Sequence, residues 1–144
     1  MKSNDIHNNF KQVQAIIPAA IGANATKTGP VLDRAGYGGV EWVIGYGSVT
    51  TTGSIVTLVA KEGDVTGTMT SIADADLYGT EALASLLAGA RVAGTGKEVS
   101  KRLGYKGSKR YVQLLAVQTG TTSVGCIAAD LLLFNPGYAP ISNP

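Results

Sequence analysis

Residues that could form a catalytic or metal site are few and scattered in this chain of 144 residues. His7 is the sole histidine and Cys126 the sole cysteine, so a nucleophile activated by histidine would need its base in a polar N-terminal segment. One histidine and one cysteine also do not make a zinc site. Residues 94–97 read Gly-Thr-Gly-Lys, but Glu98 follows where a phosphate-binding loop needs Ser or Thr. The sequence therefore predicts a protein that is not an enzyme and uses no cofactor.

Asp74, Asp76 and Glu81 form the one group of closely spaced carboxylates, and carboxylate oxygens are what a hard cation such as calcium prefers. The regularly spaced oxygen ligands of a calcium-binding loop are missing around them. Charges in a loop and at the start of a helix explain the three residues without a metal, because acidic side chains are stabilised near a helix N-terminus. We therefore favour solvated charges over a metal site.

A basic and aromatic group precedes the longest predicted strand, and its members are the candidate protein-interface residues Tyr105, Lys106, Lys109, Arg110 and Tyr111. Such a group could bind single-stranded nucleic acid, but a net charge of +2 and the lack of an interleaved aromatic platform argue against it. Arg110 could instead pair with an acidic group across a sheet. We favour contact with an acidic patch on a protein partner, since Arg and Tyr are enriched at interface centres.

The chain carries little charge for its apolar content. Charged residues make up 15% and hydrophobic residues 44%, whereas soluble domains average roughly 25% charged residues. We therefore expect part of the surface to be covered by other chains, including further copies of this one, although 19 glycines in a neutral β-protein would also dilute charge. Cys126 cannot form an internal disulfide and is expected to be buried. No signal peptide or membrane-spanning run is found, so we expect a soluble protein.

Alternating apolar residues predict several strands. Val40, Trp42, Ile44 and Tyr46 fall on one face of a strand, and Ser54 to Glu62 alternates in the same way. The segment from Tyr105 to Val117 leads into a strand with apolar residues on both faces. This pattern predicts that the strand lies inside a sheet whose two faces are both covered by other parts of the protein. Residues 119–122 read Thr-Gly-Thr-Thr and predict a hairpin turn into the apolar run from Val124 to Phe134.

The remaining elements are shorter. Gln12 to Ile17 predicts a strand ended by Pro18, and Thr80 to Ala88 predicts the one helix, with Thr80 as its N-cap. Thr66 to Ile72 and Lys97 to Leu103 read as edge strands. The predicted fold is all-β, a jelly-roll-like antiparallel β-sandwich with one short helix and extended terminal arms; a small closed barrel is the alternative. The expected divisions are an N-terminal arm with one short strand (1–30), the sandwich body (31–134) and a Pro-rich tail (135–144).

Three segments together resemble one protein family. They are Tyr-x-Gly-x-Lys-Arg-Tyr-Val at residues 105–112, Gln-Val-Gln-Ala-Ile-Ile-Pro-Ala at 12–19 and Gly-Val-Glu-Trp-Val-Ile-Gly-Tyr-Gly at 39–47. The chain resembles the cement, or head decoration, proteins of tailed bacteriophages over most of its length. The resemblance implies a jelly-roll sandwich that self-associates, as dimers or another homo-oligomer, on the outer surface of the major capsid shell.

We therefore expect a virion structural protein that cements the phage head from outside, is assembled in the host cytoplasm, and has the major capsid protein and itself as partners. Two alternatives stay open. A ligand- or carbohydrate-binding jelly-roll module would need exposed aromatics in a groove, for which the candidates are Tyr37, Tyr46, Tyr78 and Tyr138. A head-tail connector or tail protein is the other. Neither nucleic acid nor a membrane is an expected partner.

Overall fold

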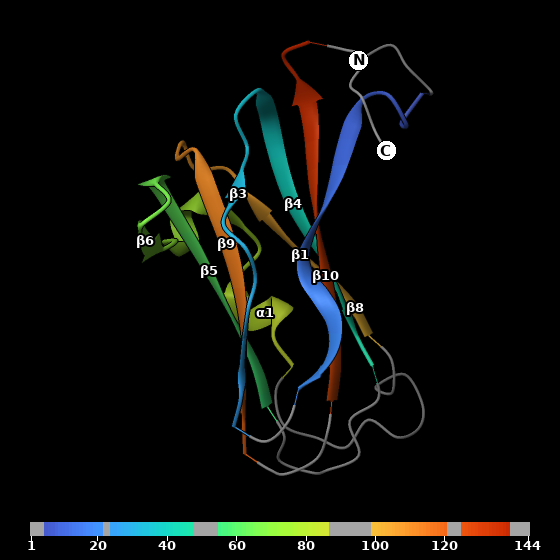
Figure 1. Cartoon of the computed structure of the whole chain (residues 1–144), viewed down its shortest axis with the longest axis vertical. Helices are drawn as coiled ribbons and strands as arrows, with labels where there is room; N and C mark the ends of the chain where they lie inside the picture. Colours follow the sequence, from blue (N-terminus) through green and yellow to red (C-terminus); the bar gives the residue numbers. More distant parts are fainter. Residues whose placement is uncertain (1–4, 22–23, 48–54, 87–98, 121–124, 139–144) are drawn as a thin grey trace.

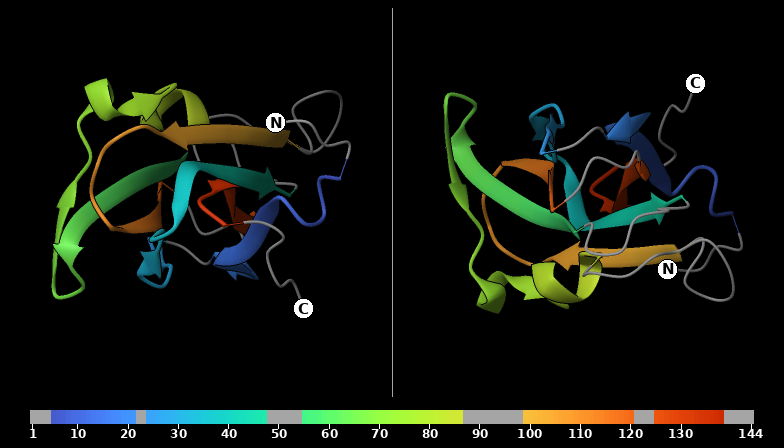
Figure 2. Two further views of the ribbon diagram at one scale, coloured as in Figure 1. Left: turned by 90° about the horizontal axis from the view of Figure 1, so that it is seen from above. Right: turned by 90° about the horizontal axis from the view of Figure 1, so that it is seen from below.

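The protein is an antiparallel β-sandwich, as the sequence predicts. The computed structural model describes residues 5–21, 24–47, 55–86, 99–120 and 125–138. Two sheets of five strands each lie face to face in Figure 1. Seen from its two ends in Figure 2, the molecule has β5 and β9 on one side and β1, β4 and β10 on the other. No helix in the described part of the chain is long and apolar enough to cross a membrane.

Sheet A has the strand order β1-β10-β4-β8-β7, and sheet B has the order β2-β9-β5-β6, with β3 also pairing to β9. The strands of sheet A are β1 (Phe10–Ile21), β10 (Gly125–Pro136), β4 (Tyr37–Tyr46), β8 (Val99–Tyr105) and β7 (Leu77–Tyr78). Those of sheet B are β2 (Thr26–Thr28), β9 (Tyr111–Thr119), β5 (Ile55–Val65), β6 (Thr68–Ser71) and β3 (Leu32–Asp33). Consecutive strands lie in different sheets except at β2–β3, β5–β6 and β7–β8. Without the two-residue strands β3 and β7, the orders β1-β10-β4-β8 and β2-β9-β5-β6 are those of a four-plus-four jelly roll.

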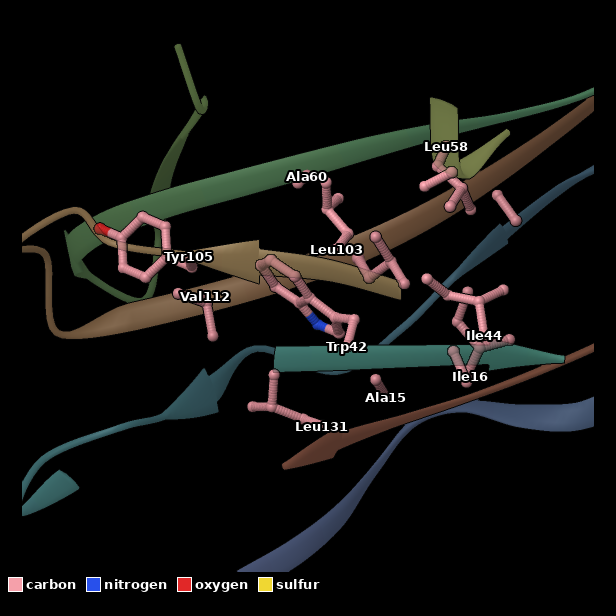
Figure 3. Close-up of a cluster of buried hydrophobic side chains, with 14 of the residues drawn as sticks. Ala15, Ile16, Trp42, Ile44, Leu58, Ala60, Leu103, Tyr105, Val112 and Leu131 are labelled. Carbon is pink, nitrogen blue, oxygen red and sulfur yellow. The ribbon is translucent and has the colours of Figure 1, made fainter. Parts of the chain in front are cut away.

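The core lies between the sheets and follows the alternation predicted from the sequence. On β4, the residues Val40, Trp42, Ile44 and Tyr46 are all buried. Their neighbours on β10 are buried too, as are the neighbours of Val40 and Trp42 on β8, namely Tyr105 and Leu103. Figure 3 shows Trp42 among side chains from both sheets. The two inward faces therefore interdigitate in a single core, as expected for a sandwich.

The hairpin predicted around residues 119–122 is wrong. β9 belongs to sheet B and β10 to sheet A, so the connection between them crosses from one sheet to the other. Each of these strands buries one face only: Val112, Leu114 and Ala116 are buried, whereas Leu115 and Val117 on the opposite face are half-exposed. Two successive strands can bury their apolar faces either by packing against each other across the core or by pairing side by side in one sheet. The apolar pattern alone does not distinguish these two arrangements.

The helix predicted from Thr80 to Ala88 is shorter than expected. α1 spans Glu81–Ala84, and the Thr80 hydroxyl accepts a hydrogen bond from the Leu83 N–H at 3.1 Å, which confirms Thr80 as the N-cap. The chain leaves the helix at Ser85, and Leu86 forms a bridge with Val56 on β5. Residues 87 and 88 lie outside the described part of the chain. The bridge ends the helix because Leu86 needs extended backbone to pair with β5.

This segment occupies the edge of β5 that β6 leaves uncovered. A short 3-10 turn (Asp74–Asp76), β7 and α1 lead the chain along that edge. The hydrogen bonds run from the Ala60 N–H to the Glu81 carboxylate, from the Leu58 N–H to the Ser85 hydroxyl (2.9 Å), and in both directions between Val56 and Leu86 (2.8 Å each). Two side chains thus supply acceptors where a neighbouring strand would supply carbonyls, and the edge is closed against further pairing.

The terminal strands also exceed their predicted lengths. The strand expected from Gln12 to Ile17 runs through Pro18, because β1 is the edge strand of sheet A, and its register to β10 shifts near Pro18. Within the loop expected before residue 30, β2 pairs with β9. β10 continues to Pro136, which lies opposite Tyr37 although the tail was expected to remain unpaired. Residues 139–144 of that tail lie outside the described part of the chain.

Gly29 lies where β1 of sheet A and β9 of sheet B both come close to the chain, so a substitution there tests this close approach. A Cβ atom there would overlap the Ala15 carbonyl oxygen of β1 and lie 2.8 Å from the Leu114 carbonyl oxygen of β9. Because both obstacles are backbone atoms, Gly29→Ala should lower the free energy of unfolding by about 1–3 kcal/mol. A denaturant melt followed by the fluorescence of buried Trp42 measures it. Gly67→Ala is the control, with open space around the new Cβ. Equal melts of the two variants would contradict the close contact.

Candidate protein-interaction site

The five candidate interface residues lie at one end of the sandwich, where the β8–β9 connection meets the turn before β4 and the β5–β6 hairpin (upper end of Figure 1). We call Tyr105, Lys106, Lys109, Arg110 and Tyr111 the basic cluster. The structure brings all five together, but their side chains have different surroundings. Tyr105 is buried, Tyr111 is half-buried and the three cations are exposed.

The buried side chain of Tyr105 holds the β8–β9 loop in place. Its hydroxyl donates to the Glu62 carboxylate and accepts the Lys109 N–H at 3.0 Å. Burial and this contact with Glu62 raise the pKa of Tyr105, so the phenol stays protonated. A Cβ at Gly107 would lie only 2.5 Å from the Tyr105 hydroxyl oxygen, so the ring fits closely against a residue without a side chain. The loop therefore takes its shape from a buried phenol.

Arg34 completes this support from the turn before β4. Its guanidinium lies 5.3 Å from the centre of the Tyr105 ring, a distance typical of a cation–π contact. The same group donates to the Gly107 carbonyl at 2.9 Å. Arg34 thus connects the turn to the β8–β9 loop through both a ring and a backbone oxygen.

Arg110 pairs with an acid of its own chain. Its Nη2 atom lies 2.7 Å from Asp33 Oδ2, and its Nε atom lies 3.1 Å from both carboxylate oxygens. The guanidinium also lies 5.1 Å from the centre of the Tyr111 ring. Asp33 lies opposite Tyr111 in sheet B, so this contact is an ion pair between neighbouring strands. Both side chains remain exposed, and ion pairs of this kind contribute little to stability.

Lys109 and Lys106 extend the cluster on either side. Lys109 Nζ lies 2.5 Å from Asp64 Oδ2 of the β5–β6 hairpin, in another exposed pair. Lys106 Nζ lies 5.1 Å from the centre of the Tyr78 ring. With Tyr105 buried and Tyr111 beneath Arg110, the cluster offers no pair of open rings on which bases could stack. The groups that the cluster exposes are the ammonium groups of Lys106 and Lys109 and the guanidinium of Arg110. Those of Lys109 and Arg110 are paired with acidic side chains.

The outer face of sheet A carries a surface that the sequence analysis missed. Ile6, Asn9, Phe10, Leu132 and Phe134 line a groove of about 330 Å³. Phe134 covers Gly39 of β4, where a Cβ would overlap its ring. The signal was available in the unbroken apolar run of residues 131–134, because a strand in a sandwich cannot bury both faces of such a run.

Cys126 is exposed, which corrects the prediction that it is buried. It belongs to the outward set of β10 with Ala128 and Leu132, whereas Ile127 and Ala129 face the core. The sequence alone did not fix which of the two sets points inward. Leu and Ala residues occur in both sets.

The three closely spaced carboxylates lie in and just after a short 3-10 turn. Glu81 accepts the Ala60 N–H, and Asp74 and Asp76 lie in the 3-10 turn before it. Burial raises the pKa of Glu81, and the charge of Asp74 adds to that effect. Among the described residues, no group of His, Cys, Asp and Glu is arranged to hold a metal.

The four tyrosines considered for carbohydrate binding have different surroundings. Tyr46 is buried, and its hydroxyl donates to the Ala84 carbonyl at 2.7 Å. Tyr78 and Tyr138 are exposed and Tyr37 is half-buried. Tyr78 lies on β7, at the opposite edge of sheet A from β1, whereas Tyr37 pairs with Pro136. Of these four tyrosines, only Tyr46 lies in the wall of a described groove, which Gly45 and Cys126 also line.

Comparisons with known proteins identify the fold. No protein-family model matches the chain, and no curated protein matches it. A solved structure of infectious bursal disease virus, Gx strain, is similar over 91% of this chain and 33% of its own, with a TM-score of 0.55 and 9% identity. The VP2 subviral particle of that virus is similar over 89% and 32%, with a TM-score of 0.51 and 9% identity.

The PBSX exported protein XepA is similar over 92% of this chain and 39% of its own, with a TM-score of 0.51 and 16% identity. The chain thus spans between a third and two fifths of the length of these structures. At such low identity the similarity is one of fold, and it agrees with the strand order described above.

Tyr105→Phe tests the buried support of the basic cluster. Loss of the hydroxyl leaves the Glu62 carboxylate and the Lys109 N–H without this partner, and the free energy of unfolding should fall by about 1–3 kcal/mol. Denaturant melts of the variant and the unmodified protein measure the difference. Tyr111→Phe is the matched control, because Tyr111 is only half-buried. Equal losses in the two variants would show that the Tyr105 hydroxyl has no special role.

Asp33 provides a test of the Arg110 ion pair. The hydrogen bond from Arg110 holds the pKa of Asp33 below its ordinary 3.8. Because the folded pKa is depressed, the ionised carboxylate stabilises the fold above pH 3.8, and this contribution is lost as the pH falls through the folded pKa. An NMR titration of the Asp33 carboxyl should have a midpoint below 3.8, and Arg110→Ala should move it back up. An unmoved midpoint would exclude the pair in solution.

Proposed function

We propose that this protein is a virion structural protein that binds the outside of a tailed-phage head and cements its shell. The observation that carries the proposal is the jelly-roll strand order. The motif at residues 105–112 resembles head decoration proteins, and that resemblance implies a jelly roll; the folded chain has this topology. Solved structures of a virus and of a subviral particle share the fold, which supports an assembly role.

Cementing requires contacts with more than one neighbour. A module that touches several shell subunits adds contacts that must all break before the shell opens, which is an avidity effect. The proposed partners are the major capsid protein and further copies of this chain. Assembly would take place in the host cytoplasm and the finished protein would reside on the head exterior.

The basic cluster is the proposed contact with the shell. Lys109 and Arg110 are exposed and lie on a loop that Tyr105 and Arg34 hold in one shape, so little freedom is lost on binding. Their present partners Asp64 and Asp33 are exposed as well. An acidic patch on the shell can therefore share or replace these acids at small cost, because the cations are only partly removed from water.

The double variant Lys109→Ala/Arg110→Ala tests this contact. It should fold normally, since both ion pairs are exposed, but occupy decoration-free heads less fully because two interfacial cations are gone. Co-sedimentation with purified heads measures occupancy. Arg102→Ala is the control: Arg102 is an exposed cation on β8 that pairs with Glu41, away from the cluster. Equal occupancy by the double variant and the unmodified protein would reject the cluster as the contact, and no binding by the unmodified protein would reject the proposed function.

A further inference from the structure

The turn at residues 5–9 holds an apolar side chain, that of Ile6, in the wall of the groove on the outer face of sheet A. Asp5 accepts hydrogen bonds from the Asn8 backbone N–H (3.2 Å) and the Asn8 amide (2.6 Å). The Asn9 N–H donates to the Ile6 carbonyl at 3.1 Å. These bonds close the turn, yet Ile6 at its tip is 66% exposed. A large aliphatic side chain is thus displayed on a well-bonded turn.

The groove lies directly beside this side chain. Phe10 on β1 lies opposite Phe134 on β10, and Phe134 lies opposite Gly39 on β4, so the three form one row across sheet A. Because Gly39 has no side chain, the Phe134 ring lies over it and leaves an apolar hollow of about 330 Å³. An apolar cavity of about 150 Å³ already accommodates a benzene-sized group, so this hollow has room for a branched aliphatic side chain.

We propose that this groove and Ile6 form a two-fold interface between two copies of the protein, with Ile6 of each copy in the groove of the other. This inference names a surface for the self-association included in the proposed function, but it does not depend on binding to a head. Ile6, the protrusion, and the groove, the hollow, are neighbours on one surface. A two-fold axis between them brings each protrusion to the other copy's hollow, so a single surface is complementary to itself.

The size of this face suits a dimer. β1 and β10 have 12 residues each, which corresponds to a length of about 40 Å, and four neighbouring strands span about 19 Å. Allowing for the shorter β4 and β8, the face covers roughly 600 Å², and the turn adds to it. A stable interface buries about 800 Å² per partner, so this face and the turn together approach the area that a dimer needs.

The charges on sheet A are compatible with pairing of like faces. Arg102 lies 3.6 Å from Glu41 of the same chain, so this pair brings no net charge to the interface. Asp130 lies two residues from Leu132 on the side away from Phe134. An axis at the groove therefore places the two Asp130 carboxylates on opposite sides of it, which limits their repulsion.

Sedimentation equilibrium of the full chain and the variant Ile6→Asp tests the interface. The unmodified protein should be a dimer at micromolar concentration. Ile6→Asp should raise its dissociation constant by about tenfold or more, because a carboxylate replaces an apolar anchor in a desolvated hollow. Ile6→Leu should retain the dimer. The fluorescence of Trp42 should be unchanged in both, since Ile6 is largely exposed and Trp42 is fully buried.

Two matched controls place the same charge on other exposed apolar positions. Val65 on β5 of sheet B is 63% exposed and Leu83 on α1 is 70% exposed, and Val65→Asp and Leu83→Asp should remain dimers. A monomeric unmodified protein, a dimer that survives Ile6→Asp, or equal dissociation by all three aspartates would each overturn the inference. Head co-sedimentation is a separate measurement, so a dimer that fails to bind heads would reject the proposed function and leave this interface in place.

Discussion

The fold depends on one row of cross-strand contacts at the centre of sheet A. Trp42 on β4 lies between Leu103 on β8 and Leu131 on β10, and all three side chains are fully buried. Among the described residues, the Trp42 indole N–H has no hydrogen-bond partner, which is a cost that the surrounding apolar burial outweighs. A register shift of one residue would turn Glu41 and its neighbours inward. The row therefore fixes which face of each strand is the core face, and with it which residues are left outside.

Closing the edges of the sandwich restricts where a partner can bind. Gly29 brings the chain against the Ala15 carbonyl, and the acceptors of Glu81 and Ser85 occupy the free edge of β5. Strand addition is therefore blocked at these two places, whereas β1 and β6 remain the outermost strands of their sheets. The described part of the chain also leaves open the loops at the end of the sandwich and the outer faces of the sheets. The basic cluster and the groove are surfaces of these two kinds.

The sequence predicts the apolar alternation of each strand and the fold class better than it predicts which strands pair with one another. Alternation from Val40 to Tyr46 identified both the strand and its core face, and Thr80 marked the helix start, because these are local properties. The hairpin after β9 and the burial of Cys126 were wrong since both depend on which sheet β10 joins, a long-range choice. The five residues of the basic cluster do lie together. Their ion pairs join residues far apart in the sequence, and no local pattern reports such partners.

In the proposed function, the two surfaces would have different roles. Charged groups such as Arg110 steer and orient an encounter, whereas an apolar anchor in a fitted hollow, such as Ile6, gives lasting affinity. One copy has one basic cluster, and a single loop can hold one shell subunit without joining it to the next. Two copies related by a two-fold axis present two such loops on one rigid body. Pairing through sheet A would therefore be what converts a protein that attaches to a shell into one that bridges it, since avidity needs both loops to bind at once.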